Sequence, residues 1–287
     1  MLYVHSFSPV ELDLYNKLAQ DTSVSQISTE RLQDIEYVEK ALQSNSNETL
    51  LYSFQKLEHY SHISSFQQEI AAVKKLLNVV QESNIKQLVL ISYPGVYINS
   101  DNLFLQHKAM VEQMFLQAGI PCTILNVQGI NNPSLQIHNL QNLFYNESEN
   151  QYLIPKKSSI PIYSITTAAL AKIILCSIQY QAINHYDAFD TLSDLAQFIK
   201  YNSSDKRIVR LYPVYLQCKS FLGLYPSINI LDLFLRPTVP MHNYRTQKEL
   251  NIDVNHIEIL DDNEKRKSIN TGLMEHSMPI HISPIFS

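Results

Sequence analysis

Short apolar runs alternate with stretches of helical periodicity through the first half of the chain. The apolar runs predict β-strands over residues 2–7, 49–54, 87–92 and 121–127, with a weaker strand over 24–27. Between them, apolar side chains recur at spacings of three and four, which predicts helices over residues 9–20, 31–44, 66–83 and 105–118. This alternation predicts an α/β fold with a parallel sheet flanked by helices.

The same pattern divides the chain into three parts. Residues 1–130 carry the regular alternation of strand and helix. Residues 131–252 begin with a polar, Asn-rich stretch and continue into further helices, so we expect a smaller region that partly completes the sheet. Residues 253–287 are charged and then rich in His and Pro, which predicts a tail.

Composition and charge narrow the classes of function. The chain holds 22 Lys and Arg against 27 Asp and Glu, a formal net charge of −5, so no basic excess attracts nucleic acid. No run of about 18 apolar residues occurs and the first residues lack the features of a signal peptide, so we expect no membrane partner and a cytoplasmic location. The three cysteines are far apart, which favours neither a disulfide framework nor a metal site.

Four segments, in order along the chain, resemble the short-chain dehydrogenase/reductase superfamily, in particular its extended and atypical branches (NmrA-like proteins and NAD-dependent epimerases/dehydratases). Residues 84–97 (NIKQLVLISYPGVY) resemble the strand that ends in a serine, and residues 104–112 (FLQHKAMVE) the helix that carries a Tyr-x-x-x-Lys motif. Residues 118–130 and 160–200 resemble the segments that follow. The resemblance implies a Rossmann-like sheet with a small C-terminal substrate-type region. It also implies an ancestor that bound NAD(P) and acted on a nucleotide sugar or another small carbonyl compound.

The glycine-rich loop of that superfamily has no counterpart at the matching position. Residues 5–11 (HSFSPVE) contain no glycine, and the whole chain has only 5. Side chains there hinder the close approach of a pyrophosphate to the backbone. Pro9 offers no N–H, and Glu11 brings negative charge to the N-terminus of the predicted helix. The resemblance implies cofactor contacts from Ser6, Ser8, Phe54 and Lys108.

The catalytic motif is also altered. Phe104 stands at the tyrosine position, four residues before Lys108. A phenyl ring has no proton to exchange, so the usual general acid is missing. Ser92 matches the serine that orients a substrate carbonyl, or it caps the end of a central strand. Tyr97 lies in the next loop, near the carboxyl ends of the strands, where open α/β sheets bind ligands. The catalytic candidates are therefore Ser92, Tyr97 and Lys108.

Two hypotheses remain open. The first is a non-catalytic member, a pseudoenzyme, that binds a small ligand or acts as a regulatory or partner subunit. The second is an NAD(P)-dependent oxidoreductase, epimerase or dehydratase with a rebuilt site, in which Tyr97 or His107 transfers the proton and Lys108 holds the ribose. The cofactor is accordingly either none or NAD(P). The expected partners are a small molecule, a second copy of this chain or another protein.

Overall fold

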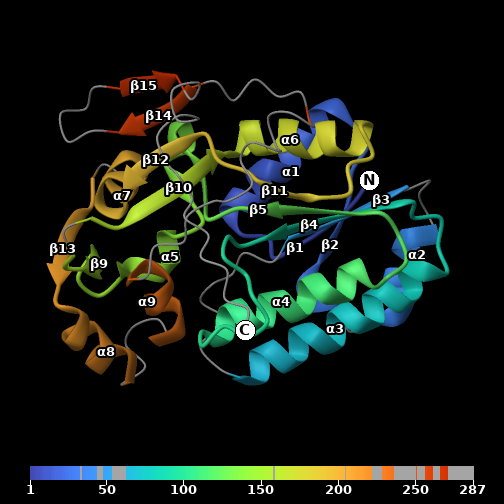
Figure 1. Ribbon diagram of the computed structural model, residues 1–287, viewed down its shortest axis with the longest axis horizontal. Helices are drawn as coiled ribbons and strands as arrows, with labels where there is room; N and C mark the ends of the chain where they lie inside the picture. The colour runs from blue at the N-terminus through green and yellow to red at the C-terminus, as the bar shows by residue number, and fades with distance from the viewer. Residues whose placement is uncertain are drawn as a thin grey trace, which may run out of the picture.

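A six-stranded sheet lies at the centre of the first half of the molecule (Figure 1). The computed structural model describes residues 1–32, 34–43, 48–53, 63–157, 159–203, 205–221, 228–235, 250, 256–260 and 266–270. All neighbouring strands of this sheet are parallel, in the order β11-β5-β4-β3-β1-β2. Its strands are β1 (Leu2–His5), β2 (Ser25–Ser28), β3 (Thr49–Ser53), β4 (Gln87–Ser92), β5 (Cys122–Asn126) and β11 (His185–Asp187).

Helices cover both faces of this sheet, because side chains that alternate along each strand point to opposite sides. On one face Leu88 and Leu90 of β4 pack in a core shared with α2 (Ile35–Gln43), α3 (Ile63–Gln81) and α4 (Leu103–Leu116). On the other face Val89 and Ile91 pack with α1 (Pro9–Asp21) and α6 (Thr167–Gln179). Figure 1 shows α1 and α6 above the sheet and α3 and α4 below it. The predicted Rossmann-like α/β fold is confirmed.

The predicted strands and helices of the first half lie close to their expected positions. The strand predicted over 87–92 matches β4, and the weak strand predicted over 24–27 is β2, shifted by one residue. Helix α1 begins as expected, with the Ser8 hydroxyl accepting a hydrogen bond from the Glu11 N–H. A short 3₁₀ turn, η1 (Thr29–Arg31), follows β2.

Two further sheets, one of six strands and one of three, are formed by strands from β6 onward. The first has the order β15-β14-β12-β10-β6-β7, and the second, which has three strands, the order β13-β9-β8. The strands of the first are β6 (Gly129–Asn132), β7 (Ile137–His138), β10 (Pro161–Thr166), β12 (Thr191–Asp194), β14 (His256–Leu260) and β15 (Arg266–Asn270). Those of the second are β8 (Tyr145–Asn146), β9 (Gln151–Pro155) and β13 (Arg207–Leu211). The remaining elements are η3 (Pro133–Leu135), α5 (Gln141–Phe144), α7 (Leu195–Asn202), α8 (Pro213–Phe221) and α9 (Ile228–Leu235).

The structure differs from the expected tail within residues 253–287. Strand β14 pairs in parallel with β12, and β15 pairs antiparallel with β14, so this segment extends a sheet of the second half. The charged run 261–267 suggested a solvated surface segment, and the strands on either side of it carry too few consecutive apolar residues to stand out in the sequence. None of the helices within the described ranges is long and apolar enough to cross a membrane.

Asp13 joins the two halves of the chain across one face of the central sheet. Its carboxylate, on α1, accepts hydrogen bonds from Asn132 Nδ2 at 2.8 Å and from the Thr167 hydroxyl, which lies at the start of α6. The carboxyl-bearing side chain is buried. It therefore holds α1 against elements that lie more than a hundred residues away in the sequence.

We expect an Asp13→Ala variant to lose about 1–3 kcal/mol of unfolding free energy, because one buried donor, Thr167, and one half-buried donor, Asn132, lose their acceptor. Chemical denaturation followed by circular dichroism measures this loss. Asp21→Ala, at the exposed end of the same helix, is the matched control and should change stability by about 0.5 kcal/mol or less. Equal effects of the two substitutions would contradict the role given to Asp13.

Candidate functional site

The strand order of the central sheet reverses between β1 and β3. From β1 the chain passes through α1 to β2 on one side, whereas β3 lies on the other side of β1. Open α/β sheets bind ligands in the crevice outside the carboxyl ends of the strands at such a switch point. Here Ser6 and Ser8 follow β1, and Ser53 ends β3. These three serines therefore mark the place where the fold would receive a ligand.

The side chain of Glu11 lies at this point. Glu11 is in the first turn of α1 and is 1% exposed. Its Oε2 accepts hydrogen bonds from the Ser6 N–H at 3.1 Å, from the Ser6 hydroxyl and from Ser8 Oγ at 3.0 Å. Its Oε1 accepts one from Ser53 Oγ at 2.8 Å. One backbone N–H and three hydroxyls thus bind a carboxylate of the protein itself, at a helix N-terminus that favours negative charge.

The loop before α1 is closed further by stacked aromatic rings. Phe7 has φ = 58°, a conformation that glycine adopts most readily, and its N–H donates to His5 Nδ1 at 3.1 Å. The His5 ring stacks on Tyr3 and meets the Phe7 ring at a tilt, with centroids 4.4 Å and 4.3 Å apart respectively. Burial lowers the pKa of His5, although the nearby Glu11 opposes that shift. The loop thus keeps a backbone conformation typical of glycine at Phe7, but it carries side chains at every position from 5 to 11.

The residues of this loop do not fit a dinucleotide pyrophosphate. Ser6 and Ser8, implied by the resemblance as cofactor residues, both bind the Glu11 carboxylate. Pro9 is the first residue of α1 and has no N–H to offer. A phosphate at this position would meet a buried carboxylate that already uses the local donors. Phe54, the other residue implied here, lies outside the described residues.

Lys108, the lysine of the altered catalytic motif, is buried and paired with an acid. Its Nζ lies 3.5 Å from Glu69 Oε1, which is on α3, and 5.8 Å from the centroid of the Phe104 ring. Burial lowers the pKa of Lys108, while Glu69, Glu112 and Glu11 oppose that shift. Only 6% of the Lys108 side chain is exposed, so this lysine is buried between the helices and does not face solvent.

The three catalytic candidates bind three different partners. Lys108 contacts Glu69, and Ser92, at the end of β4, donates its hydroxyl proton to the Glu112 carboxylate. Tyr97 is 59% exposed, and its hydroxyl accepts a hydrogen bond from Asn99 Nδ2 at 3.2 Å. Ser92 and Lys108 are fixed inside the protein, whereas Tyr97 faces solvent.

Glu69 is the centre of a buried cluster that the sequence interpretation missed. His107 Nε2 lies 2.7 Å from Glu69 Oε2, and the Tyr52 hydroxyl donates to Glu69 Oε1 at 3.2 Å. Glu69 follows the apolar Phe66 by three residues and precedes Val73 by four. An acid on the apolar face of a predicted helix was the signal that could have found it, because buried acids are normally paired.

Tyr93 is the phenol that lies directly against Phe104. It follows Ser92 in the sequence, and its ring meets the Phe104 ring edge to face with centroids 5.4 Å apart. Burial raises the pKa of Tyr93 well above its ordinary value of 10.0. A phenol with a raised pKa stays protonated at neutral pH and is a weak acid.

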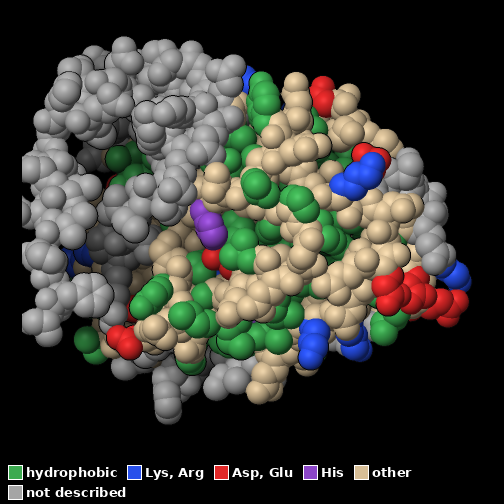
Figure 2. Space-filling model, turned by 45° about the vertical axis from the view of Figure 1, so that its right-hand side comes forward, with side chains coloured by type: hydrophobic (Ala, Val, Ile, Leu, Met, Phe, Trp, Pro, Cys, Tyr) green, Lys and Arg blue, Asp and Glu red, His purple; other side chains and the backbone are tan. Residues whose placement is uncertain are grey.

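The described surface carries no concentration of positive charge on the face shown in Figure 2. Lys and Arg side chains are scattered there singly or in small groups, among acidic and apolar side chains. Within the described residues, no group of three or more His, Cys, Asp or Glu side chains is placed to hold a metal ion. The expectation that nucleic acid is not a partner stays a prediction.

Comparison with solved structures identifies the fold. A nucleoside-diphosphate-sugar epimerase from Staphylococcus aureus superposes with a TM-score of 0.60 at 13% identity, covering 88% of this chain and 95% of that one. A triphenylmethane reductase from Citrobacter sp., complexed with NADP(H), gives 0.58 at 12% identity with the same coverage. An NADPH-dependent quinone oxidoreductase from Escherichia coli, complexed with NADPH, gives 0.57 at 14% identity, again with the same coverage.

These similarities extend over most of the chain, so this chain has the Rossmann-like α/β fold of these epimerase and reductase structures. No protein-family model matches the sequence, and no curated protein matches it. The identities are low enough that side chains at the site are free to differ. The chemistry of this chain therefore has to be argued from its own residues.

We expect Glu69→Gln to lower the unfolding free energy by about 3 kcal/mol, because Lys108 and His107 lose their buried counter-charge. Chemical denaturation measures the loss. The control is Glu36→Gln, which breaks an exposed pair with Lys40 at 2.8 Å and should cost about 0.5 kcal/mol or less. A Glu69→Gln/Lys108→Met double variant should recover part of the loss. Equal, small effects in both single variants would contradict the cluster.

Proposed function

We propose that this chain is a divergent short-chain dehydrogenase/reductase-like protein that is not an enzyme and does not bind a dinucleotide in the manner of its fold. It acts instead as a small-ligand-binding, regulatory or partner subunit in the cytoplasm. The observation that carries the proposal is the buried Glu11 carboxylate, bound by Ser6, Ser8 and Ser53 at the switch point of the sheet.

The energetic argument rests on competition for the same donors. A pyrophosphate could use the Ser6 N–H and the serine hydroxyls only if the carboxylate gave them up. Glu11 would then be a buried charge without partners, beside a second anion, and losing the partners of a buried charge costs several kcal/mol. The loop offers no further backbone donor at Pro9 to offset that cost.

The altered catalytic motif supports the same conclusion. Phe104 cannot exchange a proton, and the phenol beside it, Tyr93, has a raised pKa because it is buried. Lys108 faces Glu69 within the protein. A protein that needs neither hydride transfer nor proton transfer can keep this fold as a scaffold, because the packing of the sheet does not depend on the loop chemistry.

The alternative function is an NAD(P)-dependent oxidoreductase, epimerase or dehydratase that acts on a nucleotide sugar or a small carbonyl compound. The observation that favours it is the likeness to structures complexed with NADP(H) and NADPH. In this alternative Tyr97 or His107 transfers the proton and Lys108 holds the ribose. Lys108 would have to leave Glu69, and either His107 would have to leave it too or Tyr97 would have to turn in from solvent.

Calorimetric titration with NAD⁺, NADH, NADP⁺ and NADPH distinguishes the two functions. We expect no binding tighter than about 100 μM, which corresponds to about −5.5 kcal/mol, because Glu11 occupies the donors that a pyrophosphate needs. Binding of any of the four dinucleotides with a dissociation constant below about 100 μM would overturn the proposal. Loss of that binding in Lys108→Ala would then support the enzyme.

A second test removes the internal carboxylate. We expect inorganic pyrophosphate to raise the melting temperature of Glu11→Ala, since the Ser6 N–H and three hydroxyls become available to an anion. The parent protein and a Glu82→Ala variant, altered at an exposed acid, should show no such increase. An equal increase in the parent would mean that an anion site is open beside Glu11.

A further inference from the structure

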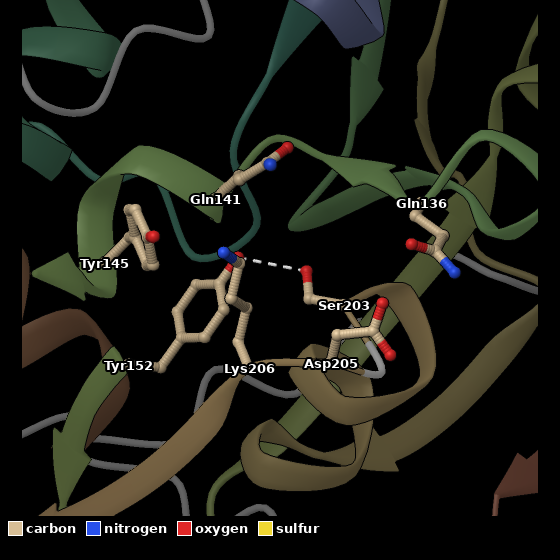
Figure 3. A pocket seen from close by; sticks show the side chains of 7 residues that line it. All are labelled: Gln136, Gln141, Tyr145, Tyr152, Ser203, Asp205 and Lys206. Carbon is tan, nitrogen blue, oxygen red and sulfur yellow. Dashed lines mark hydrogen bonds between the residues drawn. The ribbon is translucent and has the colours of Figure 1, made fainter. Parts of the chain in front are cut away.

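A hollow of about 270 Å³ lies in the second half of the chain, in a different place from the Glu11 cluster. It is bounded by α5, the β8–β9 hairpin and the segment that follows α7 (Figure 3). Residues from 136 to 206 line it, so it shares no side chain with the switch point of the central sheet. Its volume is slightly below the range of about 300–1,000 Å³ that is common for small-molecule pockets, which suits a ligand of one ring.

The lining is unusually polar for a small-molecule pocket. Tyr145 and Tyr152 contribute two phenols, Ser203 a hydroxyl, and Gln136 and Gln141 two carboxamides. Asp205 and Lys206 add one charge of each sign. Among the described residues that line it, every side chain carries a hydrogen-bonding group and none is aliphatic, whereas pockets for apolar ligands are lined mainly by hydrophobic side chains.

One wall of the hollow is a fixed and uncharged chain of hydrogen bonds. The Tyr152 hydroxyl lies 2.9 Å from Ser203 Oγ, which in turn lies 3.4 Å from His138 Nε2. Burial lowers the pKa of His138 to about 3, so the imidazole is neutral at physiological pH. Its Nδ1 has no hydrogen-bond partner, so no acid orients the ring and a Ser–His–acid catalytic triad is not formed. This wall is suited to binding, not to nucleophilic attack.

Tyr145 lies beside Tyr152, with ring centroids 5.2 Å apart, and both its hydroxyl and the nearby Lys206 ammonium have hydrogen-bond partners (Figure 3). The Tyr145 hydroxyl and the Lys206 ammonium both donate to Asn150 Oδ1, each at 2.6 Å. Lys206 Nζ also lies 5.5 Å from the centroid of the Tyr145 ring. Because Asp205 balances Lys206, the lining has no net formal charge and offers little attraction for a phosphate.

We propose that this hollow binds a neutral, polyhydroxylated ring of about the size of a monosaccharide. The amide of Gln141 and the carboxylate of Asp205 provide donors and acceptors for ring hydroxyls. The half-buried ring of Tyr145 provides a flat face for the C–H side of a sugar. This proposal does not depend on the proposed function, because the two sites share no residue and the test uses no dinucleotide.

The absence of tryptophan from the chain allows a sharp test. A Tyr145→Trp variant places a single indole in the hollow, and a Tyr212→Trp variant places one on an exposed surface outside it. We expect D-glucose or N-acetyl-D-glucosamine to change the emission of the first variant in a saturable way and to leave the second unchanged. In the Tyr145→Trp background, Gln141→Ala should weaken binding about 2- to 10-fold, since one hydrogen bond is lost, while the exposed Gln113→Ala should not.

Because the indole of the Tyr145→Trp variant could itself fill the hollow, sugar binding is also measured by saturation-transfer NMR on the protein without that substitution. A sugar signal that Gln141→Ala weakens and Gln113→Ala preserves supports the proposal. No sugar signal by either method overturns it, and so does a signal that both glutamine variants leave unchanged. Sodium phosphate or glycine displacing the sugar more effectively than a second sugar does would overturn the assignment to a neutral ligand.

Discussion

The buried carboxylate of Glu11 is the constraint on which the candidate site depends. It draws the Ser6 N–H and the hydroxyls of Ser6, Ser8 and Ser53 toward one point, and so joins the ends of β1 and β3 to the start of α1. Because the acid is part of the chain, it acts as a tethered ligand with a high effective concentration. The loop therefore needs no small molecule to be held closed.

Buried acids also bind the polar side chains around helix α4. Lys108 and His107 are paired with Glu69 of α3, and Ser92 of β4 is bound by Glu112 of α4 itself. Polar groups that a Rossmann-like enzyme would direct to a substrate thus bind one another between packed elements. Internal acids stand at both places where the fold's ancestral chemistry would be expected, so the two changes belong to one pattern.

Local sequence signals predicted the parallel sheet and its helices well. Strand β4 matches its prediction because an apolar run on both faces has few other interpretations, and α1 begins where Ser8, Pro9 and Glu11 indicate. The negative charge of Glu11 at the start of α1 was also predicted, whereas its hydrogen bond with Ser53, 42 positions away, was not. Tyr97 lies in the loop between β4 and α4, as its place in the sequence predicts. No local signal shows whether a side chain of such a loop faces the protein or solvent, and Tyr97 faces solvent.

Other features depend on packing between distant segments. Glu69 meets Lys108 only because α3 lies beside α4, and the two residues are 39 positions apart. The hollow beside Tyr152 and Ser203 forms only when the β8–β9 hairpin meets the segment after α7. The strands β14 and β15 gain their hydrogen bonds from β12 and from each other, so their short, charged sequences were interpreted as a tail.

The central sheet ends on both sides in a short strand, with four residues in β2 and three in β11. A strand of that length offers few unpaired N–H and C=O groups as a template for another chain. Joining two copies through a continuous sheet would therefore yield little hydrogen bonding at either edge. Any assembly of this protein through its central domain must rely on contacts between side chains of its helices and loops.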